Sequence, residues 1–242
     1  YTYIDSLPLK PESTAAFEVG MQTHFTNLLF HTDAITFGGS LFYNNTSNFL
    51  STALTFDENA DPSTGTNARP FFLNYDTYRL KGVDLNMAYE SAYLFINASA
   101  IFYDKPLVCS VYLAAKEGIA AWNTLGFRGS VLPNRIPPQQ SFTLSTGFYG
   151  FRQKLTAGAR IKHHSKKEYP AEWLEGTAAS GVIGELPKDY VIDIFGSYIL
   201  SKHFTINLNV DNLGDRYQYD IGSIIRMPLP GRTIRIGLEA SF

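Results

Sequence analysis

The last ten residues of the chain alternate between apolar and small or polar side chains. Ile234, Ile236, Leu238, Ala240 and Phe242 occupy every second position. A repeat of two residues places the two sets on opposite faces of a β-strand. Ordinary strands average about five or six residues, whereas a tilted strand that crosses a bilayer needs about nine to eleven. The segment is therefore predicted to be a strand of membrane-spanning length.

The same alternation recurs in eight upstream segments, so nine strands are predicted. These segments are residues 17–22, 35–44, 83–89, 94–102, 141–148, 155–161, 190–200 and 204–211. Asn, Asp, Thr, Ser and Arg recur on their polar faces, as a wet interior requires. A soluble β-sandwich shows a similar alternation with its polar face outward, so alternation alone leaves both folds open.

The lengths of the connections between the predicted strands favour one of these folds. Short connections are predicted at residues 26–32, 90–92, 150–154 and 201–202. Long connections are predicted at residues 45–76, 103–138, 162–188 and 214–230. Tight turns at one rim and long, extracellular loops at the other are typical of outer-membrane barrels. The sequence thus predicts an all-β fold, an antiparallel transmembrane β-barrel of the bacterial outer membrane.

The composition agrees with this prediction. Only 17% of the residues are charged and 14% are aromatic, whereas about a quarter of the residues of a soluble domain are charged. No window of 18 consecutive apolar residues is present, so no transmembrane helix is expected. The formal net charge of -2 gives no reason to expect nucleic acid as a partner. The single cysteine, Cys109, cannot form an internal disulfide.

The predicted number of strands is odd. Nine strands place Tyr1 on the extracellular side and Phe242 on the periplasmic side. Single-chain bacterial barrels have even strand numbers because both termini lie on one side, and an open sheet edge is not tolerated in lipid. We therefore expect residues 1–242 to be the C-terminal portion of a larger barrel. The alternative is a miscount by one, which would give a complete small barrel of eight or ten strands.

Three stretches of the sequence resemble motifs of TonB-dependent outer-membrane receptors. The first reads LKPE and consists of Leu9, Lys10, Pro11 and Glu12. The second lies in LNVDNLGDRY, is similar to the family's NLFDKRY, and includes Asn212, Leu213, Asp215, Arg216 and Tyr217. The third reads PGR and consists of Pro230, Gly231 and Arg232. Gly214 departs from the pattern, because the family commonly has Phe there.

The resemblance implies that the nine strands are the last of a barrel of roughly 22, whose earlier strands and N-terminal plug domain are absent from residues 1–242. It implies active import of an iron-containing ligand, driven by the TonB complex through the plug, with no enzymatic reaction and no cofactor. The ending is most similar to the haem and haemophore branch, so haem or haemophore-delivered haem is the expected ligand. Ferric siderophores or other nutrients are the alternative, followed by a passive porin-type channel or a small adhesin barrel.

Two histidines are weak candidates for ligand binding. His163 and His164 lie where a strand is predicted to leave the membrane on the extracellular side. An imidazole can ligate haem iron, but the following Ser165, Lys166 and Lys167 are typical of a solvated loop. In the resembled branch the extracellular ligand precedes the LKPE stretch. No HExxH, CxxC or EF-hand spacing is present, so no metal site is predicted.

The apolar face of the terminal strand has two predicted partners. Ile234, Ile236, Leu238, Ala240 and Phe242 are expected to face outer-membrane lipid. A terminal strand of this kind also resembles the signal that the barrel-assembly machinery reads. The same side chains can serve both partners.

Overall fold

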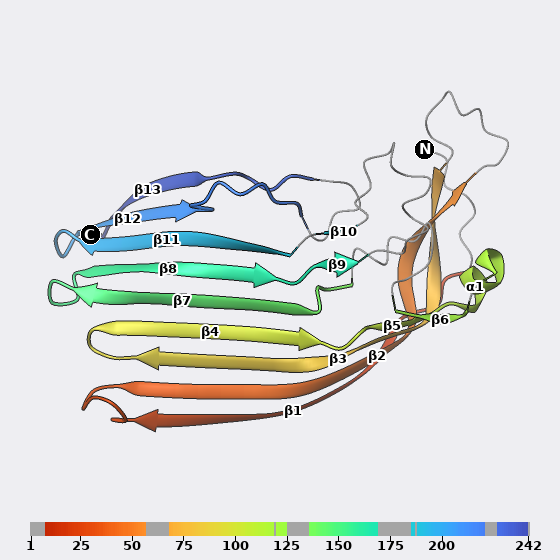
Figure 1. The fold of residues 1–242 in the computed structure, drawn as a ribbon, viewed down its shortest axis with the longest axis horizontal. Helices are drawn as coiled ribbons and strands as arrows, with labels where there is room; N and C mark the ends of the chain where they lie inside the picture. The colour runs from red at the N-terminus through yellow and green to blue at the C-terminus, as the bar shows by residue number, and fades with distance from the viewer. Residues whose placement is uncertain are drawn as a thin grey trace.

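Nine long strands form the body of the molecule. The computed structural model describes residues 8–56, 68–118, 120–124, 136–168, 185–186, 188–220 and 227–241. The nine strands are β1 (Ser13–Thr26), β2 (Ala34–Phe56), β3 (Ala68–Glu90), β4 (Leu94–Tyr103), β7 (Gln140–Gly150), β8 (Leu155–His164), β11 (Asp189–Ile199), β12 (Phe204–Asp211) and β13 (Thr233–Ala240). They form one antiparallel sheet in which each strand pairs with its predecessor in this series (Figure 1). Each of the nine predicted strands corresponds to one of these nine long strands of the described residues.

The connections alternate between two rims of the sheet, as predicted. Short turns connect the strands at one of their two ends, which we call the short-turn rim. These turns are residues 27–33, 91–93, 151–154 and 200–203. The backbone N–H of Ser241 donates to His203 O at 2.9 Å, so the last described residue lies at this rim. The remaining connections lie at the other end of the strands, which we call the long-loop rim (Figure 1). No helix of the described residues is long and apolar enough to cross a membrane.

The prediction of a long loop over residues 45–76 is wrong in extent, because most of these residues belong to strands β2 and β3. β2 and β3 remain paired from Asn45 and Arg79 out to Phe56 and Ala68. At the long-loop rim this hairpin bends away from the other strands, with a short helix beside it (Figure 1). The pairing persists because Phe71, Leu73 and Tyr75 alternate along β3 and are buried. Residues 57–67 lie outside the described part of the chain.

The predicted loop over residues 103–138 also contains regular structure. It forms β5 (Leu107–Cys109), the helix α1 (Val111–Glu117) and β6 (Trp122–Asn123). The helix begins at Ser110, whose side chain accepts from Leu113 N, and it ends at Gly118, where φ is 68°. Side chains from β3, β5, α1 and the segment before β7 form one hydrophobic cluster: Phe71, Leu73, Tyr75, Val108, Leu113, Ala114 and Ile136. Burial of this cluster holds the protruding hairpin and the helix together.

Two short strands complete the long-loop rim. They are β9 (Lys167–Glu168) and β10 (Glu185–Leu186), which pair with each other. Both fall within the connection predicted at residues 162–188. Residues 169–184 of this connection lie outside the described residues.

The register shows which residues share a face of the sheet, because directly paired residues point to the same side. One row of paired residues runs across seven strands through Met21, Gly39, Leu85, Ala100, Phe142, His163 and Tyr190. The adjacent row runs through Gly20, Ser40, Asp84, Ile101, Ser141, His164 and Asp189. We call the side of the first row the outer face and the side of the second row the inner face.

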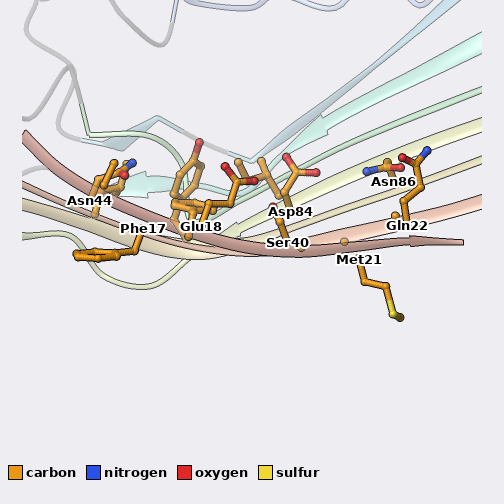
Figure 2. A pocket seen from close by; sticks show the side chains of 16 residues that line it. Phe17, Glu18, Met21, Gln22, Ser40, Asn44, Asp84 and Asn86 are labelled. Atoms are coloured by element: carbon orange, nitrogen blue, oxygen red, sulfur yellow. The ribbon is translucent and has the colours of Figure 1, made fainter.

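The two faces differ in polarity as the sequence predicts. In Figure 2, Phe17 and Met21 point away from the other strands, whereas Glu18, Gln22 and Asp84 point toward them. The outer face leaves large apolar side chains exposed, including Ile234 (63%), Ile236 (77%) and Leu238 (67%) on β13. Exposed apolar surfaces of this kind mark sites of interaction with a membrane or with another protein. The outer face is therefore the surface expected to contact lipid.

Aromatic rings cover glycines on the inner face. A Cβ added at Gly158 would lie 2.5 Å from Thr146 O and 2.7 Å from Phe195 Cζ. We predict that Gly158→Val lowers the free energy of unfolding by about 1–3 kcal/mol, the usual effect of overpacking. Gly237→Ala is the matched control, because the nearest atom to its added Cβ is Asn207 Cβ at 3.9 Å. Urea unfolding of both variants in lipid vesicles measures the difference, and equal midpoints would contradict the prediction.

A buried carboxylate closes the turn between β1 and β2. Asp33 is 2% exposed, and it accepts from the backbone N–H groups of Leu28 (2.7 Å), Leu29 (2.8 Å) and Phe30 (3.1 Å). The Tyr89 hydroxyl donates to the same carboxylate at 3.2 Å. Burial alone would raise the pKa of Asp33, but these four hydrogen bonds outweigh it and hold the pKa below its usual value.

The lowered pKa of Asp33 makes the turn sensitive to acid. The stabilisation from the charged carboxylate is complete above the unfolded pKa of about 4 and is lost as the pH falls through the lower folded pKa. We predict that hydrogen-exchange protection of the Leu28, Leu29 and Phe30 amides decreases in acid. In Asp33→Asn, protection should be weaker at neutral pH and should not decrease further in acid. Protection that is the same in both proteins at every pH would contradict this account.

Candidate functional site

The inner face of β1, β2 and β3 is a polar wall. It borders an open hollow of about 800 Å³. The polar side chains of this wall include Glu18, Gln22, Ser40, Asn44, Asp84 and Asn86 (Figure 2). Carboxylate, hydroxyl and amide groups at these positions can donate to and accept from a polar occupant. The wall is thus suited to binding a polar occupant.

The inner face of β7, β8 and β11 carries paired charges. Lys162 Nζ lies 2.7 Å from Asp193 Oδ2, and the Asp193 side chain is buried. Arg160 Nε donates to Ser145 Oγ at 3.2 Å, and its guanidinium lies 5.9 Å from the centre of the Phe195 ring. These contacts orient the two cations along the wall. Among the described residues, no group of three or more His, Cys, Asp or Glu side chains is placed to hold a metal ion.

The two candidate histidines point to opposite faces. His163 belongs to the outer row with Phe142 and Tyr190, whereas His164 belongs to the inner row with Ser141 and Asp189. His163 Nδ1 lies 2.8 Å from Asp189 O, and His164 Nδ1 lies 3.0 Å from Ser165 O. A carbonyl oxygen only accepts, so each Nδ1 carries the proton and each Nε2 is the nitrogen with a lone pair when the ring is neutral.

The LKPE stretch fastens the chain to the protruding hairpin before β1 begins. The Asn74 side chain accepts from Lys10 N at 2.7 Å and donates to Lys10 O at 2.9 Å. The Asn48 side chain donates to Pro11 O at 3.4 Å, and the Glu12 carboxylate accepts from Leu50 N. β1 reaches only as far as the pair Ser13–Ser47, so Glu12 supplies an acceptor beyond its end. Leu9 is 46% exposed and Pro11 is exposed.

The NLGDRY stretch forms a closed turn at the long-loop rim. The Asn212 side chain donates to Arg216 O at 2.8 Å and accepts from Arg216 N at 2.9 Å. Asn212 and Asp215 have φ values of 51° and 50°, a conformation that Asn and Asp tolerate better than most residues. Leu213 N donates to Ile192 O at 2.7 Å. The Asn212 side chain therefore sets the shape of the turn.

Contacts to β11 hold this turn in place. Asn212 N donates to Asp193 Oδ1 at 3.0 Å. Arg216 Nε donates to Asp189 Oδ1 at 2.8 Å, and the guanidinium lies 4.3 Å from the centre of the Tyr190 ring. Tyr217 stacks edge-on against Tyr219, with ring centres 5.1 Å apart. Asp193 and Asp189 were not among the site residues predicted from the sequence, because the sequence gives no sign of which loop each would meet.

The PGR stretch joins the same cluster. Asp215 Oδ1 accepts from Arg232 N at 2.8 Å, and the Thr233 hydroxyl donates to Gly231 O at 3.2 Å. Pro230 is exposed. β13 then begins at Thr233, and its Arg235 pairs with Asp211 of β12. The second and third motifs thus contact each other and fix how the last two strands meet the long-loop rim.

The predicted lipid-facing residues of the last strand lie together on the outer face. Ile234, Ile236, Leu238 and Ala240 are all exposed there and pair with β12. Phe242 lies outside the described residues.

Comparison with known proteins agrees with this architecture. The family model described as TonB dependent receptor-like, beta-barrel, matches residues 1–213. The hemophilin receptor of Acinetobacter baumannii is 22% identical over 256 residues, which cover 97% of the chain and 23% of that protein. The chain therefore spans about a quarter of the length of this curated relative.

Solved structures of the same kind share the fold. The Serratia marcescens hemophore receptor HasR, a double mutant in complex with its hemophore HasA and heme, superposes with a TM-score of 0.64 at 19% identity. A mutant of the ferric enterobactin receptor PfeA from Pseudomonas aeruginosa superposes with a TM-score of 0.62 at 18% identity. Each match covers 97% of the chain and 32% of the solved structure. At these identities the likeness establishes the fold and not the ligand.

The nine long antiparallel strands of the sheet, its polar inner face and the family match over residues 1–213 agree with one another. The chain belongs to the family of TonB-dependent receptor β-barrels.

Proposed function

We propose that the native protein imports an iron-containing ligand across the bacterial outer membrane by TonB-dependent active transport. The family match over residues 1–213 is the observation that carries this proposal. The exposed apolar outer face provides the contact with outer-membrane lipid, and the polar inner face provides the wall of the transport path. The transport step breaks no covalent bond, so the protein is proposed not to be an enzyme.

In this proposal, residues 1–242 supply nine C-terminal strands of a barrel of roughly 22. A plug domain and the earlier strands complete the native protein. The polar wall around Glu18, Gln22 and Asp84 then contacts the plug, and the plug receives the energy of the inner-membrane proton gradient through the TonB complex. The barrel-assembly machinery inserts the barrel by reading the apolar face of β13.

Haem, either free or delivered by a haemophore, is the proposed ligand. Two relatives support it, the hemophilin receptor and the hemophore receptor HasR. Ferric siderophores are the second candidate, because the ferric enterobactin receptor matches the fold almost as well. A passive porin is the third candidate, and it would need neither plug nor TonB.

His164 is the proposed iron ligand of this chain, because it lies on the inner face and offers Nε2 to a ligand. His163 points to the outer face and serves as the matched control. His164→Ala is expected to shift the Soret band of bound haem, whereas His163→Ala is expected to leave it unchanged. An identical Soret band in both variants would assign the iron ligand to another part of the protein.

Haem titration of the whole native protein tests the proposed ligand. Saturable binding with a shifted Soret band is the expected result. Growth on haem as the only iron source, compared in cells with and without TonB, tests the transport mechanism. Growth that depends on the protein but not on TonB would favour the porin, and binding of ferric enterobactin without haem binding would favour the siderophore receptor.

A further inference from the structure

The outer face carries an apolar groove across the neighbouring strands β4, β7, β8, β11 and β12 (Figure 1). Its volume is about 880 Å³. One row of directly paired lining residues runs through Leu94, Phe148, Ala157, Gly196 and Leu208. The row continues to Ile236 of β13, so the groove opens on the outer face, the surface expected to contact lipid.

The floor of the groove is left open by small residues, Ala157 and Gly196, in the middle of a row of large ones. Within 4 Å, a Cβ added at Gly196 would meet one atom of the described residues beyond its chain neighbours, Thr156 O at 3.5 Å. An unfilled groove forgoes van der Waals contacts, and a lipid chain can supply them in a bilayer. Lipid chains are as apolar as the groove walls, so the hydrophobic effect does not select an occupant there. Selection of one lipid over another therefore depends on shape and on charge at the end of the groove.

The groove ends at the short-turn rim, against the turn between β7 and β8. Leu155, which lines the groove, is the first residue after this turn. Tyr198, which also lines the groove, meets the ring of Phe151 in the turn edge-on, with ring centres 6.2 Å apart. Ile199 N donates to Lys154 O at 2.9 Å. These contacts fix the turn against the end of the groove.

The two turns that border this end of the groove, between β7 and β8 and between β11 and β12, carry positive charge. Arg152, Lys154 and Lys202 are exposed there, and neither turn contains Asp or Glu. Glu90 and Glu239 lie near the same rim, but the register places both on the inner face. The charge at the end of the groove is therefore complementary to an anionic lipid headgroup.

We propose that the groove binds an acyl chain of an anionic phospholipid of the periplasmic leaflet, whose phosphate lies at the turns that carry Arg152, Lys154 and Lys202. The short turns of outer-membrane barrels lie on the periplasmic side, so these cations lie at the level of the headgroups. Arginine and lysine donate charge-assisted hydrogen bonds to phosphate oxygens. The inference rests on the proposed contact between the outer face and lipid, and it is independent of the imported ligand.

Photolabelling of the whole native protein in phosphatidylcholine vesicles tests the proposal without variants. The probe is a phosphatidylglycerol with a diazirine on its acyl chain. Peptide mass spectrometry is expected to find most of the label on residues 148–159 and 194–208 and little on β2 and β3. Unlabelled phosphatidylglycerol should compete about 3- to 10-fold better than phosphatidylcholine. Label spread evenly over the outer face, or equal competition by the two lipids, would overturn the inference and leave the lipid contact standing. Absence of label from the outer face would overturn both.

Two variants separate the charge of the site from its shape. The triple variant Arg152→Gln, Lys154→Gln, Lys202→Gln is expected to lose the preference for phosphatidylglycerol. Gly196→Ile fills the groove and is expected to remove the concentration of label there. Ala100→Ile is the matched control for Gly196→Ile, because Ala100 lies on the outer face of β4 and is not among the described residues that line the groove. Its labelling should match that of the wild type. A triple variant with an unchanged preference, or Gly196→Ile with unchanged labelling, would contradict the proposed site.

Discussion

Replacing Asp193 with alanine is expected to lower the free energy of unfolding of the barrel by about 2–4 kcal/mol. The buried carboxylate of Asp193 pairs with Lys162 and accepts from Asn212 N. Its removal leaves the ammonium of Lys162 without this partner and the N–H of Asn212 without its acceptor. The effect is at the lower end of the range for buried ion pairs, because the Lys162 side chain is 48% exposed.

Urea unfolding in lipid vesicles measures this loss, and two variants separate its causes. Asp193→Asn keeps an oxygen for Asn212 N and removes the charge, so its effect should be smaller. Glu239→Ala removes an exposed carboxylate from the inner face of β13 and should change the free energy of unfolding by less than about 0.5 kcal/mol. Equal losses in Asp193→Ala and Glu239→Ala would contradict a structural role for Asp193.

Replacing Ile236 with lysine is the second change with a large expected effect. Ile236 is 77% exposed on the outer face and lies in the middle of β13, opposite Leu208. A lysine on the lipid-facing side of a barrel costs about 2–4 kcal/mol near the bilayer midplane. We expect Ile236→Lys to lower the free energy of unfolding by this amount and to reduce the amount of folded protein in the outer membrane.

Gly237→Lys is the matched control for Ile236→Lys. Gly237 is the next residue of the same strand, and it pairs with Asn207 on the inner face. The nearest neighbour of an added Cβ is Asn207 Cβ at 3.9 Å, so a side chain fits. The folded amount of Gly237→Lys should stay close to that of the wild type. A control variant as damaging as Ile236→Lys would mean that the two faces of β13 are assigned incorrectly.

The nine strands and their two faces were predictable because both follow from local alternation. Ile234, Ile236 and Leu238 already mark the outer face in the sequence, and the register places them there. Short turns were predictable for the same reason, since few residues separate the alternating segments. The ends of the strands were less predictable than the strands themselves. β1 spans Ser13–Thr26, whereas clear alternation covers only residues 17–22.

The protruding hairpin was missed because its stability comes from distant residues. Phe71, Leu73 and Tyr75 alternate clearly, and this signal was available in the sequence. Their burial, however, depends on Val108 and Leu113 in the next connection. A sequence pattern does not show which loop will cover such a face.

The motifs were recognised from the sequence, but their contacts were not. Lys10 meets Asn74 across 64 residues, and Asn212 meets Asp193 across 19. The pairing of β1, β2 and β3, and of β11 with β12, brings the segments that carry these partners together. The structure gives the second and third motifs a shared role in fixing the turn before β13, with Asp215 accepting from Arg232 N.

Quenching by brominated lipid, measured at successive positions of β13, tests the assignment of the faces most directly. Single cysteines at positions 234 to 239, each carrying a fluorophore, are placed in a Cys109→Ala background of the whole native protein in vesicles. Probes at 234, 236 and 238 are predicted to be quenched strongly, and those at 235, 237 and 239 weakly. Equal quenching at all six positions, or the reverse alternation, would contradict a lipid-facing outer side and a wet inner side.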